Sequence, residues 1–156
     1  MVEIFDNFLN FEEINFLQQY NIFWGTQDSD PNNPYNLDFL YYSVPEGESY
    51  FYEYLFEKIK KVIGDYFIDR LYFNGQSYGM DGSFHVDHCD KTVLIYVSPY
   101  HREWGGFTQI EGQIIPPITG RMIAFDGMIP HKGFCFSRQN CPLRISLAYK
   151  LSKLNT

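Results

Sequence analysis

The sequence predicts an α+β fold in which two helices precede a jelly roll of short antiparallel strands. Apolar residues recur with the period of a helix in the first part of the chain and with a period of two after Gly64. Turn-forming residues separate the segments of period two. With 156 residues the chain has the length of one domain, so we expect one unit over residues 1–156, helical over about 1–66 and a jelly-roll core over about 67–156.

Two helices are expected before the strands. Asn10 followed by Glu13 resembles a capping box, and the apolar residues that follow predict a short helix over Phe11–Tyr20. A longer helix is expected over Ser49–Ile63, where apolar residues are spaced by three or four and a glycine follows as the stop. Between the two helices, residues 28–36 (DSDPNNPYN) are dense in turn formers and predict a loop.

Six short strands are expected in the second part of the chain. Their ranges are Phe67–Asn74, Ser83–Asp87, Thr92–Val97, Phe107–Ile110, Met122–Phe125 and Arg144–Leu151. Alternate residues of a strand face opposite sides, so the last strand has one packing face and one polar or small face. The packing face carries Ile145, Leu147, Tyr149 and Leu151, and the other carries Arg144, Ser146, Ala148 and Lys150. If the second face turns inward in a two-sheet roll, it lines a cavity.

Composition excludes several classes of protein. The 19 acidic against 12 basic residues give a net charge of -7, which disfavours nucleic acid and anionic lipid as partners. Hydrophobic residues make up 45% of the chain and aromatic residues 19%, enough for a core, so disorder is excluded. No apolar run approaches the roughly 18 residues that a membrane span needs. Three cysteines without a CxxC pair favour a reducing compartment; they are Cys89, Cys135 and Cys141.

A metal site is suggested by His85 and Asp87, which stand two residues apart on a predicted strand. Both side chains project from the same face, so they can chelate one ion, and His131 is the next histidine that could join them. Two neutral imidazoles and one carboxylate form the facial triad that suits Fe(II). Such a set leaves the metal with one positive charge, which favours an anionic co-substrate. His88 and Cys89 are rival ligands, although His88 has the opposite strand parity.

Arg144 supports the hypothesis of a metal site with an anionic co-substrate. It follows His131 by 13 residues and stands on the predicted cavity side, with Ser146 next on the same face. A buried arginine needs a partner, and a fork of donors beside a hydroxyl suits a carboxylate ligand. The alternative is that Arg144 pairs with one of the protein's own acids, such as Asp126.

Together these residues resemble the HxD…H…RxS arrangement of the 2-oxoglutarate- and Fe(II)-dependent oxygenase superfamily. The chain also resembles the prolyl 4-hydroxylase-like branch of this superfamily in four further segments, residues 94–98, 104–108, 116–126 and 131–133. The opening residues 4–9 and the two expected helices resemble the support helices of that branch, so the resemblance spans most of the chain. It implies a double-stranded β-helix, the cupin-like form of the jelly roll.

The resemblance also implies a role for each candidate residue. The catalytic iron would be held by His85, Asp87 and His131, and Arg144 would bind the distal carboxylate of 2-oxoglutarate. Contacts to the co-substrate are also implied for Tyr96 at that carboxylate, for Tyr78 near the metal-binding end and, secondarily, for Ser146. Two departures stand out: collagen-type prolyl hydroxylases use lysine for the distal carboxylate, and their Gly-Gly-Glu is here Gly105-Gly106-Phe107.

The implied activity is hydroxylation of an unactivated C–H bond, with O2 as co-substrate and release of succinate and CO2. The expected substrate is a prolyl residue of a peptide or protein, and the expected cofactors are Fe(II), 2-oxoglutarate and ascorbate. The carboxylate at Asp87 disfavours halogenation. Two alternatives stay open: the same chemistry on a free amino acid, another small molecule or a nucleobase, and a metal-binding jelly roll without catalysis. Residues 28–42 are a candidate lid over the substrate.

The resemblance further suggests where the protein acts. Small members of this kind occur in bacteria and in bacteriophages, so we expect a cytoplasmic protein of a bacterium or of an infected host. We expect a monomer or a weak homo-oligomer.

Overall fold

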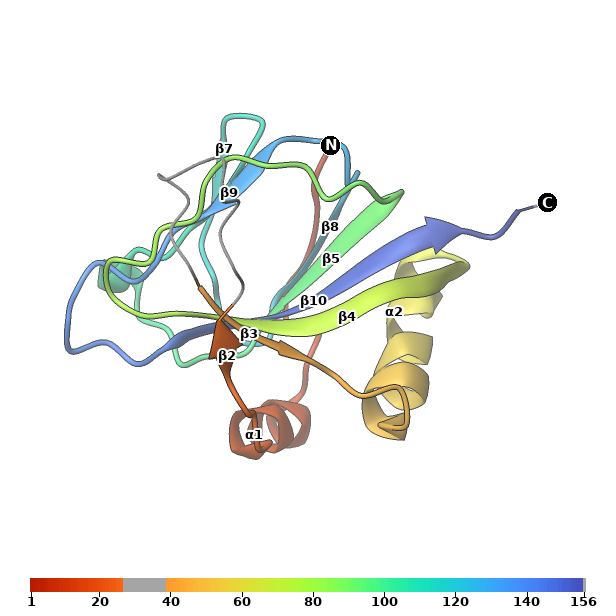
Figure 1. Ribbon diagram of the computed structural model, residues 1–156, viewed down its shortest axis with the longest axis horizontal. Helices are drawn as coiled ribbons and strands as arrows, with labels where there is room; N and C mark the ends of the chain where they lie inside the picture. The colour runs from red at the N-terminus through yellow and green to blue at the C-terminus, as the bar shows by residue number, and fades with distance from the viewer. Residues whose placement is uncertain (27–38, 156) are drawn as a thin grey trace.

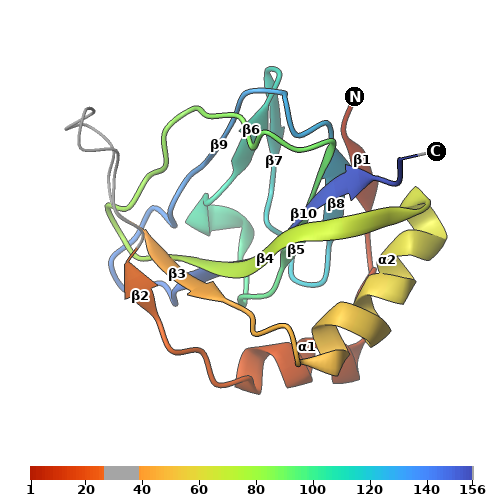
Figure 2. The same ribbon diagram turned by 45° about the vertical axis from the view of Figure 1, so that its right-hand side comes forward.

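Two antiparallel sheets face each other in the computed structural model, which describes residues 1–26 and 39–155 (Figures 1 and 2). The large sheet has the strand order β1-β8-β5-β10-β4-β3-β2, and the small sheet has the order β7-β6-β9. The strands of the large sheet are β1 (Glu3–Phe5), β2 (Gly25–Thr26), β3 (Leu40–Ser43), β4 (Tyr66–Gln76), β5 (Lys91–Tyr96), β8 (Met122–Phe125) and β10 (Arg144–Lys153). Those of the small sheet are β6 (Thr108–Ile110), β7 (Gln113–Ile115) and β9 (His131–Gly133). The predicted α+β jelly roll is confirmed.

The helices lie on the side of the large sheet that faces away from the small sheet (Figure 2). Helix α1 (Phe11–Gln19) begins at a capping box, in which Asn10 and Glu13 each accept a hydrogen bond from the other's backbone N–H at 2.8 Å. A π-helical turn, η1 (Tyr50–Leu55), leads into α2 (Phe56–Ile63), and Gly64 ends it with φ 97°. Both predicted helices are therefore confirmed. A short 3-10 turn, η2 (Arg102–Trp104), precedes β6.

The two faces of β10 separate the core from the cavity. Leu147, Tyr149 and Leu151 are fully buried against the helices, and the Tyr149 hydroxyl donates to the Phe51 carbonyl at 2.7 Å. The alternate residues face the small sheet. They are Arg144, Ser146, Ala148 and Lys150, all buried as well. The alternation predicted for this strand is confirmed, and its inner face is the floor of the site.

One predicted strand was wrong. Ser83–Asp87 is not a regular strand, because within it only His85 forms a β-bridge, to His131. Five short strands were not predicted, and all except β3 lie at the edge of a sheet; they are β1, β2, β3, β7 and β9. The predicted loop over residues 28–36 lies outside the described residues, as does most of the candidate lid over 28–42. Within the described ranges, no helix has the length and apolar character needed to cross a membrane.

Candidate metal centre

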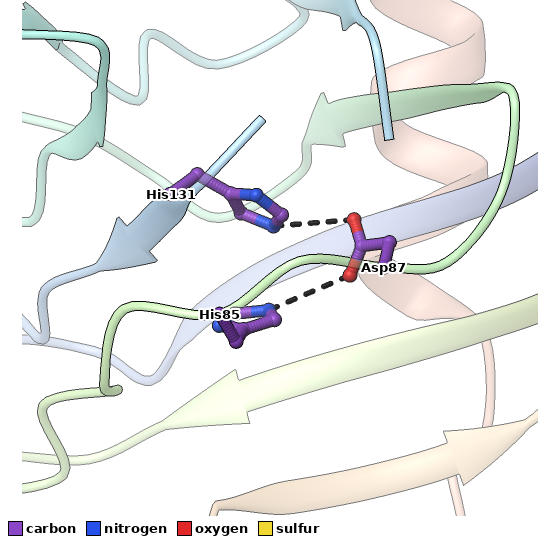
Figure 3. A group of neighbouring side chains, drawn as sticks. All are labelled: His85, Asp87 and His131. Atoms are coloured by element: carbon purple, nitrogen blue, oxygen red, sulfur yellow. Dashed lines mark ion pairs between the residues drawn. The ribbon is translucent and has the colours of Figure 1, made fainter. Parts of the chain in front are cut away.

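The three predicted ligands converge although two of them are far from the third in the sequence. A pair of backbone hydrogen bonds between His85 and His131, each 3.0 Å, brings their chain segments together. Asp87 is held by its own N–H, which donates to the Gly127 carbonyl at 2.7 Å. Figure 3 shows both rings turned toward the Asp87 carboxylate. One ligand atom from each residue lies within 4.8 Å of the others, so the triad can hold one ion.

Backbone carbonyls fix which nitrogen of each ring faces the centre. His85 Nδ1 lies 2.8 Å from the Ser83 carbonyl, and His131 Nδ1 lies 2.9 Å from the Ile129 carbonyl. Because a carbonyl only accepts, each Nδ1 carries a hydrogen, so Nε2 of each ring faces the centre. Nε2 offers a lone pair to a metal when the ring is neutral, and it donates a hydrogen bond to Asp87 when the ring is protonated. Metal-bound histidines are commonly oriented in this way.

The Asp87 carboxylate sits between the two Nε2 atoms. Oδ1 lies 3.5 Å from that of His85, and Oδ2 lies 3.2 Å from that of His131. Oδ2 also accepts hydrogen bonds from Thr92 Oγ1 at 2.6 Å and from Lys150 Nζ at 2.5 Å. Burial would raise the pKa of Asp87, but bonds to the two histidines and the charge of Lys150 bring it well below its ordinary value. The carboxylate is therefore ionised and ready to bind a cation.

Arg144 is the first residue of β10, and its side chain lies on the inner face of that strand. It is 3% exposed. Its Nε donates to the Gly106 carbonyl at 2.7 Å, and its two terminal nitrogens donate to Gln76 Oε1 at 2.9 Å and to Thr108 Oγ1 at 3.0 Å. These acceptors are neutral, and in the described part of the chain no carboxylate forms an ion pair with Arg144, so the Asp126 alternative is not what the structure shows. A guanidinium has five N–H donors, so two remain for a ligand. Burial lowers the pKa of this arginine.

Thr108 links Arg144 to Tyr96. The Tyr96 hydroxyl donates to Thr108 Oγ1 at 2.7 Å, and the Arg144 guanidinium stands 5.6 Å from the centre of the Tyr96 ring. Both lone pairs of the Thr108 hydroxyl are thus used, and its own hydrogen is left to point elsewhere. The hydroxyl can therefore donate to a ligand beside the guanidinium.

A cavity connects the metal centre with Arg144. It lies over the inner face of the large sheet and is bounded on the other side by residues of β6 and β9. Its walls are Phe39, Tyr72, Asn74, Gln76, Gly82, His85, Leu94, Thr108, His131, Gly133, Arg144, Ser146 and Lys150. The side-chain oxygen Oδ1 of Asn74 is buried there without a hydrogen-bond partner among the described residues. A ligand that enters this cavity can meet both ends at once.

Most of the predicted site residues meet in or around this cavity. Tyr96 lies behind Thr108, fully buried, and burial raises the pKa of its hydroxyl. Tyr78 is the exception, because the chain turns at Ser77, whose carbonyl accepts the Met80 N–H. Its side chain is 54% exposed and lines a separate hollow beside Phe107. Tyr78 therefore lies outside the cavity that connects the triad with Arg144.

Several polar groups that complete the site were not among the predicted site residues. Gln76 and Thr108 orient Arg144, while Thr92 and Lys150 hold Asp87. Strand parity was the available signal for Lys150, which lies on the same face of β10 as Arg144. The rival ligands His88 and Cys89 line a different hollow on the surface and are not part of the triad.

Comparison with known proteins places the chain by its fold. No family model matches the sequence, and no curated protein matches it. Solved structures do match over 99% of this chain. A 2OG-Fe(II) oxygenase family oxidoreductase from Burkholderia pseudomallei has a TM-score of 0.73 at 15% identity, with 86% of that chain covered. A prolyl-4-hydroxylase from Pseudomonas putida has a TM-score of 0.71 at 13% identity, with 93% covered.

A viral collagen prolyl hydroxylase from Paramecium Bursaria Chlorella virus-1, solved as its 2OG complex, is similar too. Its TM-score is 0.73 at 16% identity, with 96% of that chain covered. At such identities the likeness defines the fold, which is that of the 2-oxoglutarate and Fe(II) oxygenases. The fold implied by the resemblance in the sequence is thereby confirmed, and the structure brings together a His-Asp-His triad in that fold.

Proposed function

We propose that the protein is a 2-oxoglutarate- and Fe(II)-dependent dioxygenase that hydroxylates a prolyl residue of a peptide or protein. The observation that carries this proposal is the environment of Arg144. Arg144 has a buried guanidinium without a carboxylate partner among the described residues, in a cavity that leads to a His-Asp-His triad. A buried charge of this kind is costly unless a ligand neutralises it.

The triad fits a divalent metal. Two lone-pair nitrogens and an ionised carboxylate face one another within 4.8 Å, an arrangement of acceptors that a cation would satisfy. Without a cation, the hydrogen bond that His85 Nε2 donates to the Asp87 carboxylate raises the pKa of His85. His85, Asp87 and His131 would hold the metal, and two nitrogens with one oxygen are the set typical of non-haem Fe(II).

The opposite end fits the distal carboxylate of 2-oxoglutarate. Two N–H donors of Arg144 and the hydroxyl hydrogen of Thr108 are available on one side of the cavity, and Gln76 and Gly106 keep the guanidinium in place. Ser146 lines the floor between the two ends. When bound, Fe(II) and 2-oxoglutarate supply the O2-dependent oxidation that yields succinate, CO2 and a hydroxylated product. The task of these residues is to orient the co-substrate.

The apolar walls keep water away from the centre. Tyr72 and Leu94 are 9% and 8% exposed, and Phe125 packs edge-on against the His131 ring with centroids 4.8 Å apart. Apolar side chains on these sides would shield the centre from water and so limit side reactions. His85, in contrast, is exposed, which leaves one side of the metal centre open to a substrate.

A prolyl substrate is supported by the aromatic surface next to this opening. Phe84 is 56% exposed, and the Lys132 ammonium lies over the rings of Phe84 and Phe134, at 5.9 and 4.5 Å from their centres. Aromatic rings are common contacts for proline-rich peptides. Two of the similar solved structures are prolyl hydroxylases.

A cytoplasmic location belongs to the same proposal. The thiols of Cys89, Cys135 and Cys141 are all free. Free thiols are expected in a reducing compartment, which supports this placement.

Anaerobic spectroscopy tests the cofactors. Addition of Fe(II) and 2-oxoglutarate to the wild-type protein is expected to give a visible metal-to-ligand charge-transfer band, which His131→Ala and Arg144→Ala should lose. Arg121→Ala is a matched control, because Arg121 pairs with Asp6 outside the cavity. A colourless wild-type mixture would contradict the proposal.

Mass spectrometry tests the substrate. Proline-containing peptides are expected to gain the mass of one oxygen atom, with equimolar release of succinate. Succinate release that depends instead on a free amino acid or another small molecule would keep the chemistry and reject the prolyl substrate. Metal binding without turnover of 2-oxoglutarate would favour a non-catalytic module.

A further inference from the structure

Lys150 is a buried cation beside the metal centre, and it is not one of the three proposed metal ligands. It lies on the inner face of β10, at the opposite end of that face from Arg144, and is 2% exposed. Its ammonium donates to Asp87 Oδ2 at 2.5 Å and lies 5.7 Å from the centre of the Tyr72 ring. Asp87 is the one carboxylate with which it pairs in residues 1–26 and 39–155.

Lys150 helps to give the two oxygens of Asp87 different roles, because Oδ2 accepts hydrogen bonds from the protein while Oδ1 can bind a cation. Oδ2 accepts from both Lys150 and Thr92, at 2.5 and 2.6 Å, so its lone pairs are largely used. Oδ1 accepts no hydrogen bond from Lys150 or Thr92, and it lies 3.5 Å from Nε2 of His85. The carboxylate is thereby held in one orientation with Oδ1 available to a cation.

The charge of Lys150 also changes the balance of the whole cavity. Asp87 carries the single negative charge of the triad, and the positive charge of Lys150 offsets it. The site would therefore neutralise neither of the two positive charges of a divalent ion. None of the cavity-lining residues is acidic, and Arg144 adds a further positive charge at the other end. The described part of the cavity therefore disfavours a lone dication and favours a dication together with a dianion.

We propose that Lys150 is a positioning residue that couples metal binding to co-substrate binding. It fixes Asp87 through Oδ2, and its charge weakens the binding of a divalent metal until a dicarboxylate enters the cavity. By linkage, the metal and the dicarboxylate then strengthen each other's binding by the same factor. This inference rests on the proposed function, because it takes the His-Asp-His triad as the metal site and 2-oxoglutarate as the dianion.

Titration of the full chain with Mn(II), with and without saturating 2-oxoglutarate, tests the coupling. In the wild type, 2-oxoglutarate is expected to tighten Mn(II) binding by about tenfold or more. Lys150→Met should bind Mn(II) alone about tenfold more tightly than the wild type, and 2-oxoglutarate should then add less than about threefold. Lys150→Gln keeps a hydrogen-bond donor without the charge and should behave in the same way. Lys150→Arg keeps the charge and should retain the coupling.

Lys58→Met is the matched control. Lys58 forms the same kind of pair with a buried carboxylate, that of Glu13 at 2.7 Å, but lies outside the cavity. Its Mn(II) affinity and coupling should equal those of the wild type. Circular dichroism confirms that each variant is folded before it is titrated, and Lys150→Gln replaces Lys150→Met if the latter is not.

Two outcomes would overturn this inference. Wild-type coupling in both Lys150→Gln and Lys150→Met would make Lys150 a structural ion pair only, and loss of coupling in Lys150→Arg would refute the charge argument. The proposed function survives either result. If the wild type binds neither Mn(II) nor 2-oxoglutarate, both the inference and the proposed function fail.

Discussion

Replacement of Arg144 by methionine removes the proposed receptor for the co-substrate while it keeps most of the side-chain volume. The variant loses the guanidinium charge and all three of its hydrogen bonds, to Gly106, Gln76 and Thr108. It also leaves the cavity without a cation at that end. The triad lies at the other end, so we expect metal binding to be retained and 2-oxoglutarate binding to be lost.

The size of the effect follows from the burial of Arg144. Removing one partner of a buried, hydrogen-bonded charge pair costs about 2 to 5 kcal/mol in binding. Since about 1.4 kcal/mol corresponds to a factor of ten, the dissociation constant for 2-oxoglutarate should rise roughly 30-fold to 4,000-fold. Arg144→Lys keeps a charge but not the two-pronged geometry, so its loss should lie between the wild type and methionine.

Calorimetric titration of 2-oxoglutarate into the Mn(II)-loaded protein measures this change without turnover. Arg121→Met is the control, because Arg121 is 11% exposed and pairs with Asp6 at 2.6 Å away from the cavity. A dissociation constant for Arg144→Met within about threefold of the wild type would refute the assignment of Arg144, since about 0.7 kcal/mol is too little for a buried charge pair.

Three further predictions concern the scaffold. Leu147→Ala should lower the free energy of unfolding by about 2 to 5 kcal/mol, because Leu147 is 0% exposed; urea unfolding that shows less than 1 kcal/mol would contradict this. Burial would raise the pKa of Glu13, but bonds to Asn10 and Lys58 lower it, so its stabilisation is full above its unfolded pKa and is lost as the pH falls through the folded one. The stability gap between wild type and Glu13→Gln should thus narrow below about pH 4.3; a constant gap would contradict it. Gly127→Ala should weaken Mn(II) binding, since a Cβ there would lie 2.4 Å from the Cys89 carbonyl, whereas Gly47→Ala meets nothing within 4 Å and should not.

Local sequence signals predicted most of the regular structure. The capping box at Asn10 and Glu13 and the alternation along β10 are each written in a few consecutive residues, and both are seen in the structure. The segment Ser83–Asp87 was predicted as a strand because its side chains alternate. It lacks a continuous partner strand, and pairing between distant segments is not encoded in alternation.

The site was predictable to the extent that its residues follow strand parity. The parity of β10 predicted Arg144 on the inner face, where the structure also has it, whereas Asp87 was predicted from the parity of Ser83–Asp87, which is not a regular strand. Tyr78 was expected near the same cavity, but its orientation depends on a turn in a glycine-rich segment. The hydrogen bonds from Thr92 to Asp87 and from Arg144 to Thr108 join separate strands, so only the packed structure shows them.

The inner face of β10 explains why one strand can serve both ends of the cavity. Its inward residues run cation, small, small, cation: Arg144, Ser146, Ala148 and Lys150. The strands on either side present larger side chains at these levels, since Asn74 and Tyr96 flank Ser146, and Tyr72 and Leu94 flank Ala148. Of these four residues Arg144, Ser146 and Lys150 line the cavity, whereas Ala148 is buried in a hydrophobic cluster. The proposed dicarboxylate would therefore lie over Ser146, with one carboxylate at Arg144 and the other toward the metal centre.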